Sequence, residues 1–155
     1  MRVFRLTRNK YAKELNGKGA SKSGNRWNSK GTEMIYSAES RALAMAEVIV
    51  HLPLHTLPND YVMVELNVPS NIPVKELRLK DLPDNWSDNP PAHQTQKIGD
   101  DFINANNFCI LKVPSAVVPE DYNYLINPYH KQFENISIIA IKGFFFDPRL
   151  SRSHL

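Results

Sequence analysis

The clearest pattern in the chain is the alternation of hydrophobic and polar residues over positions 61–68. The hydrophobic positions are Val62, Val64, Leu66 and Val68. This period of two predicts a strand with one buried face. Shorter apolar runs predict further strands at residues 1–6, 33–37, 108–113, 136–141 and 144–146.

A helical period covers residues 37–50. Its apolar positions follow the i, i+3, i+4, i+7, i+8 spacing of a buried helix face: Ala42, Met45, Ala46, Ile49 and Val50. Ser37 is the predicted N-cap of this helix. Residues 94–104 predict a weaker helix, and residues 11–15 predict a single helical turn.

Mixed strands and helices of this kind predict an α+β fold. The chain has 155 residues, 42% of them hydrophobic, which is enough for one core. Because neither an internal repeat nor an interdomain linker interrupts the pattern, we expect residues 1–155 to form a single compact domain.

Residues 16–31 hold four of the six glycines, in the sequence NGKGASKSGNRWNSKG. Glycine at this density predicts irregular backbone that can approach a ligand closely. Residues 1–51 also carry ten Lys and Arg against four Asp and Glu, whereas the remainder carries nine against twelve. A basic region of this kind either attracts phosphate-bearing ligands or forms a solvated surface.

The single cysteine, Cys109, lies in an apolar run and is expected to be a buried thiol. One cysteine excludes a disulfide within the chain and a cysteine-based zinc site, and it suits a reducing cytoplasm. The charged N-terminal sequence and the absence of a long apolar window predict a cytoplasmic protein outside the membrane.

Two charged residues stand out in their local sequence. Glu47 lies in an otherwise apolar helical stretch, either as a functional carboxylate or as a solvated residue at the helix edge. Arg26 lies beside Trp27 in the glycine-rich loop, where its guanidinium either binds a phosphate or stacks on the indole.

Tyr36 and Ser115 each lie at the end of a predicted strand. Tyr36 either fills the core or stacks on an aromatic ligand. No Gly-x-Ser-x-Gly sequence surrounds Ser115, so it is interpreted as a hydrogen-bonding residue and not as a hydrolase nucleophile.

The common nucleotide and metal motifs are missing from the sequence. It contains neither GxGxxG nor GxxxxGK[ST], which excludes the Rossmann and P-loop sites. Pro53 separates His51 from His55, and His130 has no second ligand at a suitable spacing, so no metal is expected.

Several blocks of the sequence resemble the RES-domain toxins of bacterial RES-Xre toxin-antitoxin pairs. These blocks are RVFRL at 2–6, GNRWNSKG at 24–31, IYSA at 35–38, AEVIVH at 46–51, LKVPSAVV at 111–118, NYLINPYH at 123–130 and FDPRL at 146–150. The resemblance implies a fold similar to ADP-ribosyltransferases of the diphtheria-toxin kind, with NAD consumed as a substrate. It assigns the site to Arg26, Tyr36, Glu47 and Ser115.

The chemistry of NAD cleavage suggests a role for each residue. Glu47 stabilises positive charge that develops on the ribose, and Arg26 binds the pyrophosphate as a bidentate donor. Tyr36 stacks on the nicotinamide. Ser115, Asn28 and Asn127 are candidates for polar contacts with the substrate.

The sequence leaves both the acceptor and the class of function undecided. The acceptor of the ribosyl group is water, phosphate or a protein side chain. A ribonuclease with Glu47 as base and His51 or His130 as acid is a second class, and a non-catalytic binding module that docks through residues 16–31 is a third. The resemblance further implies an Xre-type helix-turn-helix antitoxin as partner, a toxin homodimer within that complex, and no direct nucleic-acid binding by this chain.

Overall fold

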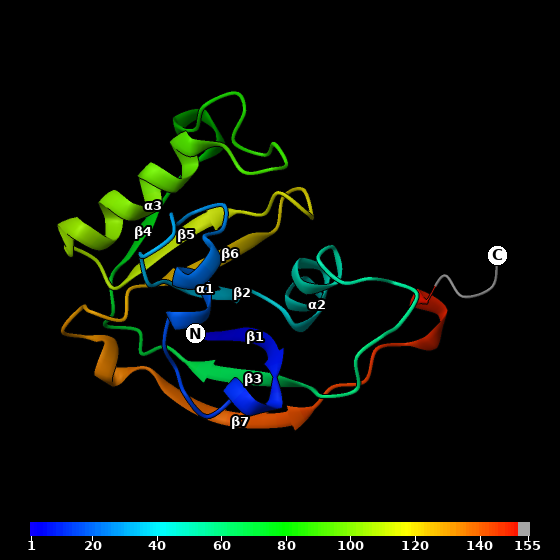
Figure 1. The fold of residues 1–155 in the computed structure, drawn as a ribbon. Helices are drawn as coiled ribbons and strands as arrows, with labels where there is room; N and C mark the ends of the chain where they lie inside the picture. The colour runs from blue at the N-terminus through cyan, green and yellow to red at the C-terminus, as the bar shows by residue number, and fades with distance from the viewer. Residues whose placement is uncertain (152–155) are drawn as a thin grey trace.

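A mixed seven-stranded sheet forms the centre of the fold in a computed structural model that describes residues 1–151 (Figure 1). The strands are β1 (Arg2–Arg8), β2 (Ile35–Ala38), β3 (Tyr61–Asn67), β4 (Val74–Glu76), β5 (Ile110–Pro114), β6 (Tyr122–Ile126) and β7 (Ser137–Gly143). Their order is β4-β5-β6-β2-β1-β3-β7. The pairing of β4 with β5 is parallel, and every other pairing is antiparallel.

Two longer helices cover different parts of this sheet. Helix α2 (Arg41–Ile49) packs against the β1–β3 region through Leu43 and Ala44. Helix α3 (His93–Ala105) packs over β5 and β6 through Phe102 and Ile103 (Figure 1). Shorter helical segments are α1 (Lys18–Ser23), η1 (Asn9–Tyr11), η2 (Leu79–Asp81), η3 (Phe133–Asn135) and η4 (Pro148–Leu150). The α+β class is therefore confirmed.

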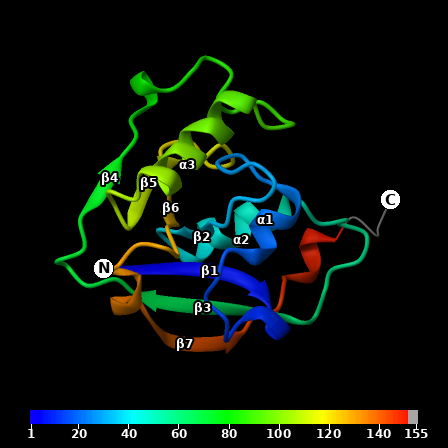
Figure 2. The same ribbon diagram turned by 60° about the vertical axis from the view of Figure 1, so that its left-hand side comes forward.

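Strand β3 is buried on both faces, not on one. Val62, Val64 and Leu66 pack into one core cluster, as the alternation predicts. Met63 belongs to a second cluster beneath α2, and Glu65 on the same face is also buried. The reason is the position of β3 in the sheet, between β1 and β7 (Figure 2). Its second face belongs to the core cluster that also contains Leu43 and Ala44 of α2.

The buried carboxylate of Glu65 fixes the start of α2. Its Oε2 accepts a hydrogen bond from Arg41 Nη2 at 2.8 Å, and Arg2 Nη1 lies 2.9 Å from Oε1. The Arg41 guanidinium also lies 4.4 Å from the ring centre of Phe4. Since a buried carboxylate is unfavourable without cationic partners, these contacts hold α2 in one place on the sheet.

Helix α2 begins later than the sequence pattern predicts. Its N-cap is Ser40, whose hydroxyl accepts from Leu43 N at 3.0 Å. Ser37, the predicted cap, is a buried residue of β2, where its hydroxyl donates to the carbonyl oxygen of Tyr124 at 2.7 Å. The predicted apolar stripe is correct in part. Met45 and Ile49 pack against the core cluster, but Ala42 and Val50 are exposed, and the buried residues of the helix are Leu43 and Ala44.

Other differences concern short elements. Strands β4 and β6 were not predicted, and residues 144–146 are not a strand. The helical turn expected at 11–15 is the earlier η1, and α1 lies inside the segment predicted to be irregular. Within the described residues, no helix is long and apolar enough to cross a membrane.

Candidate active site

Glu47 lies on α2 and contacts residues at the connection between β5 and β6 and at the start of β6. This connection lies beside α2 in the ribbon (Figure 1). Its Oε1 accepts a hydrogen bond from Ser115 Oγ at 2.7 Å. The same oxygen accepts a second hydrogen bond from Asn123 Nδ2 at 2.6 Å. Hydrogen bonds to a carboxylate are short and strong, so one residue of the turn after β5 and one residue of β6 hold this side chain in place.

Ser115 is the first residue after β5, and its hydroxyl is fully used. Besides donating to Glu47, Oγ accepts hydrogen bonds from Val117 N at 3.0 Å and Val118 N at 2.9 Å. A serine hydroxyl has one hydrogen and two lone pairs, and all three are engaged here. In the structure Ser115 therefore contacts Glu47 and the following turn; the contact with the substrate suggested by the sequence stays a prediction.

Tyr36 connects β2 to the glycine-rich loop. Its hydroxyl donates to Asn28 Oδ1 at 2.7 Å and accepts from Trp27 N at 3.1 Å. Burial raises the pKa of the Tyr36 phenol well above its usual range, so the hydroxyl keeps its proton at neutral pH. Tyr36 thus fixes the backbone next to Arg26.

The buried side chain of Asn28 holds the glycine-rich loop together through hydrogen bonds to its backbone. Its side chain is fully buried, and Nδ2 donates to the carbonyl oxygens of Ala20 and Thr32, both at 3.0 Å. A third, longer hydrogen bond from Nδ2 reaches the carbonyl oxygen of Ser29 at 3.2 Å. With Oδ1 occupied by Tyr36, the amide of Asn28 stabilises the loop and is not presented for the substrate contact that the sequence suggested.

The loop is docked on one face of α3. Gln96 Nε2 donates to the carbonyl oxygen of Asn25 at 3.0 Å, and Asp100 accepts from both the backbone N and the hydroxyl of Ser29. Between them lies Gly99, where an added Cβ would stand 1.5 Å from the carbonyl oxygen of Trp27. The glycine therefore permits a backbone contact that any side chain would prevent.

Arg26 bridges this loop to the segment before α3. Its Nη1 donates to the carbonyl oxygens of Trp86 and Asp88, each at 2.8 Å. The rings of Trp27 and Trp86 stack beside it, with centres 6.5 Å apart. Burial lowers the pKa of Arg26, and the negative charge of Glu47 opposes that effect. Arginine stays protonated under such shifts, so the site holds a cation.

The structure thus brings together Arg26, Tyr36 and Glu47. Both Arg26 and Tyr36 interact electrostatically with the carboxylate, although the three residues come from a loop, a strand and a helix. Ser115 joins them through Glu47. Asn123 belongs to the same group and was not singled out in the sequence, because nothing in the local pattern of β6 distinguishes it.

Asn127 lies apart from this group. It follows the opposite end of β6 from Asn123, and four residues of strand span about 13 Å. Its amide donates to Asn106 Oδ1 at 2.9 Å and accepts from Tyr129 N at 2.9 Å. Its side chain is fully buried and closes a turn, whereas the sequence suggested a polar contact with the substrate.

The histidines proposed for a ribonuclease do not bond to Glu47. His51 is exposed beyond the end of α2. His130 is buried, and its Nδ1 accepts from Gln132 N at 3.2 Å. In the described part of the chain, the hydrogen bonds to Glu47 come from Ser115 and Asn123, so no imidazole is paired with this carboxylate as an acid–base partner.

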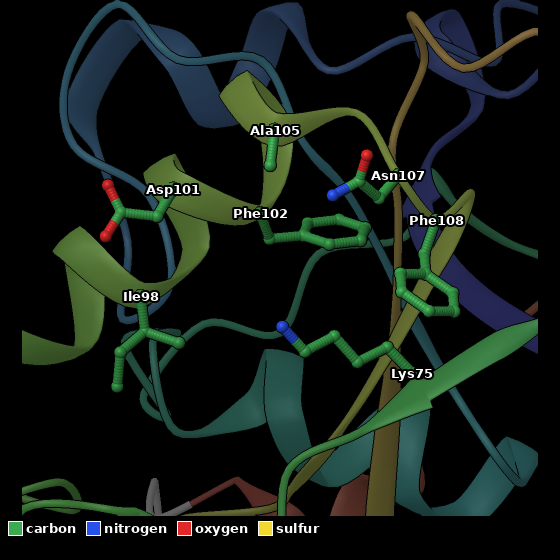
Figure 3. Close-up of a pocket in the computed structure, with 7 residues that line it drawn as sticks. All are labelled: Lys75, Ile98, Asp101, Phe102, Ala105, Asn107 and Phe108. Atoms are coloured by element: carbon green, nitrogen blue, oxygen red, sulfur yellow. The ribbon is translucent and has the colours of Figure 1, made fainter.

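A separate pocket of about 300 Å³ lies between β4 and the C-terminal half of α3. Lys75 extends from β4 toward Phe102 on the helix (Figure 3). Its lining residues include none of the side chains around Glu47. Across residues 1–151, no group of three or more His, Cys, Asp or Glu side chains is arranged to hold a metal ion.

Comparison with known sequences identifies relatives over nearly the full length. Residues 2–147 match the RES domain family. The chain is 36% identical over 153 residues to a protein named Toxin Res from Yersinia enterocolitica, covering 97% of this chain and 99% of that protein. It is 34% identical over 153 residues to the Prs ADP-ribosylating toxin of a Sphingobium species, covering 97% and 95%.

A solved structure shares the fold. It is the Mycobacterium tuberculosis MbcT-MbcA toxin-antitoxin complex, in which one chain matches with a TM-score of 0.75. The match covers 96% of this chain and 85% of that one, at 18% sequence identity. At this identity the likeness establishes a common fold.

Proposed function

The chain belongs to the RES-domain family, and on that premise we propose that it is a toxin that cleaves the bond between nicotinamide and ribose in NAD. One observation carries the proposal: Ser115 and Asn123 hold the carboxylate of Glu47 by two hydrogen bonds. Burial has the larger effect on the pKa of Arg26 on the loop and that of Tyr36 on β2, and the negative charge of this carboxylate acts to raise both. A fixed carboxylate near a cation and an aromatic ring suits a substrate that carries phosphates and a flat, positively charged ring.

Cleavage breaks the bond from the ribose C1′ to the nicotinamide nitrogen. The electron pair of this bond goes to the nitrogen and neutralises the ring, while positive charge develops on the ribose. An acceptor oxygen then bonds to C1′ and releases its proton. Glu47 lowers the barrier because its negative charge lies where the positive charge develops.

Arg26 is proposed to bind the pyrophosphate. Its hydrogen bonds within the described residues use Nη1, which leaves Nη2 and Nε to donate to phosphate oxygens. The backbone carbonyls of Trp86 and Asp88 fix the guanidinium plane before substrate binds. Such preorganisation reduces the entropy that binding costs.

Tyr36 is proposed to present its ring to the nicotinamide. Its hydroxyl is held by Trp27 and Asn28, so the ring cannot rotate away from its position. A half-buried aromatic ring with a fixed orientation provides a stacking surface at little entropic cost.

The acceptor of the ADP-ribosyl group decides which of three reactions takes place. Water gives free ADP-ribose, inorganic phosphate gives phosphorolysis, and a protein side chain gives ADP-ribosylation. The last is a second candidate because the Sphingobium relative is named an ADP-ribosylating toxin.

An experiment with adenosine-labelled NAD separates these reactions. Purified protein is incubated with the label in buffer, in buffer with phosphate, and with a bacterial lysate. Nicotinamide release with soluble labelled ADP-ribose supports hydrolysis, a phosphate-dependent product supports phosphorolysis, and label retained on protein supports transfer. Release of no nicotinamide in all three mixtures contradicts the proposed function.

An antitoxin partner fits the same proposal. The shared fold occurs in a solved toxin-antitoxin complex. We propose that an Xre-type helix-turn-helix antitoxin covers the Glu47 site and that two toxin chains assemble in that complex, in the cytoplasm where NAD is available. Co-expression with the product of the adjacent gene should yield a stable complex without nicotinamide release, and light scattering should report two toxin chains.

We also propose that the fold is similar to that of ADP-ribosyltransferases of the diphtheria-toxin kind. Superposition of the seven-stranded sheet on an ADP-ribosyltransferase of the diphtheria-toxin kind should place the NAD of that enzyme beside Glu47. Residues 1–155 should unfold as one domain, in a single transition followed by two spectroscopic probes.

A further inference from the structure

We propose that Asn123 is a positioning residue that, together with Ser115, binds Oε1 of Glu47 and thereby leaves Oε2 as the oxygen that acts on the ribose. This inference rests on the proposed NAD cleavage. It assigns a role to a residue that touches Glu47 and not the substrate.

The position of Asn123 is set by two neighbouring strands. It is the second residue of β6, opposite Ala38 of β2 and Val113 of β5. Because both neighbours hold its backbone, the side chain projects from a rigid point on the sheet. Its Nδ2 reaches Glu47 Oε1 at 2.6 Å, a short contact typical of a donor bound to a charged acceptor.

The two donors to Glu47 Oε1, Ser115 and Asn123, belong to different structural elements. Ser115 belongs to the turn after β5, whose amide groups hold its hydroxyl, and Asn123 belongs to β6. The final torsion of a glutamate side chain is otherwise broad, because rotation there meets little resistance. Two donors on one oxygen fix that torsion and thus the direction of the other oxygen.

The amide of Asn123 suits a position beside the Glu47 carboxylate, whereas a second carboxylate at residue 123 would not. An amide donates a hydrogen bond without bringing charge, whereas aspartate would put a second negative charge about 3 Å from Glu47. Burial has the larger effect on the pKa of two nearby titratable groups, Arg26 from the loop and Tyr36 from β2, and the charge of Glu47 acts to raise both. In Asn123→Asp, uptake of one proton by the pair of carboxylates would restore a donor, so activity should return as the pH falls.

The test measures nicotinamide release by wild type, Asn123→Ala, Asn123→Asp and the control Asn71→Asp. Asn71 is exposed and lies on the loop after β3, so the control adds the same charge outside the site. Losing a hydrogen bond to a charged group predicts a fall in kcat of about tenfold to a hundredfold in Asn123→Ala. KM should change by less than about threefold, since the contacts proposed for binding are intact.

The pH profile supplies a second readout. The kcat of Asn123→Asp should rise toward acid pH relative to wild type, while Asn71→Asp should follow the wild-type profile. If Asn123→Ala does not fold, Asn123→Ser replaces it; the serine hydroxyl is too short to reach Glu47, so kcat should fall as it does for alanine.

Each outcome decides the inference. A folded alanine or serine variant with wild-type kcat, or an aspartate variant with the wild-type pH profile, overturns the role of Asn123 while leaving NAD cleavage in place. Absence of nicotinamide release by the wild type itself overturns the proposed function, and the inference with it.

Discussion

Ser115 donates its hydroxyl hydrogen to Oε1 of Glu47 at 2.7 Å, although 68 positions separate the two residues in the chain. The same hydroxyl accepts from two backbone amides of the following turn. Ser115 therefore couples the turn between β5 and β6 to the carboxylate on α2.

Replacing Ser115 by alanine should affect both activity and stability. The variant removes one donor from Glu47 and leaves the amides of Val117 and Val118 without their acceptor. Unpaired groups of this kind cost about 1–3 kcal/mol of unfolding free energy. Urea unfolding and nicotinamide release measure the two effects, with Ser70→Ala as an exposed control. Unchanged stability and kcat would contradict the role assigned to Ser115.

Tyr36→Phe keeps the aromatic ring and removes the hydroxyl that holds the loop. Asn28 Oδ1 and Trp27 N each lose a partner, so we expect the unfolding free energy to fall by about 1–3 kcal/mol. KM for NAD should rise because Arg26 is next to the released backbone. The measurements are urea unfolding and steady-state kinetics. A phenylalanine variant with wild-type stability and KM would show that the hydroxyl does not position the loop.

Gly99→Ala tests the contact between α3 and the loop. Its Cβ would meet the carbonyl oxygen of Trp27 at 1.5 Å, so the helix and the loop must separate. Overpacking of this kind costs about 1–3 kcal/mol, and activity should fall with it. Gly19→Ala is the matched control, because an added Cβ in α1 meets nothing within 4 Å. That substitution should be neutral or stabilising by up to about 1 kcal/mol. Equal stability of the two variants would contradict the packing described.

Cys109 should resist thiol reagents in the folded protein. Its side chain is fully buried, and burial raises the pKa of the thiol to about 11. A raised pKa keeps the thiol protonated at neutral pH, so the reactive thiolate is scarce until the pH approaches that value. Mass spectrometry after iodoacetamide treatment at about pH 7.5, with and without urea, measures the modified fraction of Cys109. Rapid modification without urea would show that the residue is accessible.

Strong local patterns in the sequence predict much of the fold. The alternation around Val64 gives β3, and the helical spacing around Phe102 gives α3. Strands β4 and β6 have no comparable signal, because β4 is an exposed edge strand of three residues and β6 carries half-buried polar and aromatic residues. Their positions depend on pairing with β5.

The candidate site is predictable only in part. The resemblance assigns the site to Arg26, Tyr36, Glu47 and Ser115. In the structure Ser115 is hydrogen-bonded to Glu47. Burial has the larger effect on the pKa of Arg26 and that of Tyr36, and the charge of Glu47 acts to raise both. The functions of Asn28 and Asn127 in closing turns, and the contact of Asn123 with Glu47, depend on partners distant in the sequence. Spacing along one chain does not report such contacts.

The most direct test of the role of Glu47 in NAD cleavage is nicotinamide release by wild type and Glu47→Gln. Glutamine keeps an oxygen acceptor for Ser115 and Asn123 but removes the negative charge. We expect release by the wild type and a loss of at least about a hundredfold in the variant, with a melting temperature within about 4 °C of wild type. A folded Glu47→Gln variant that releases nicotinamide at the wild-type rate would contradict this role.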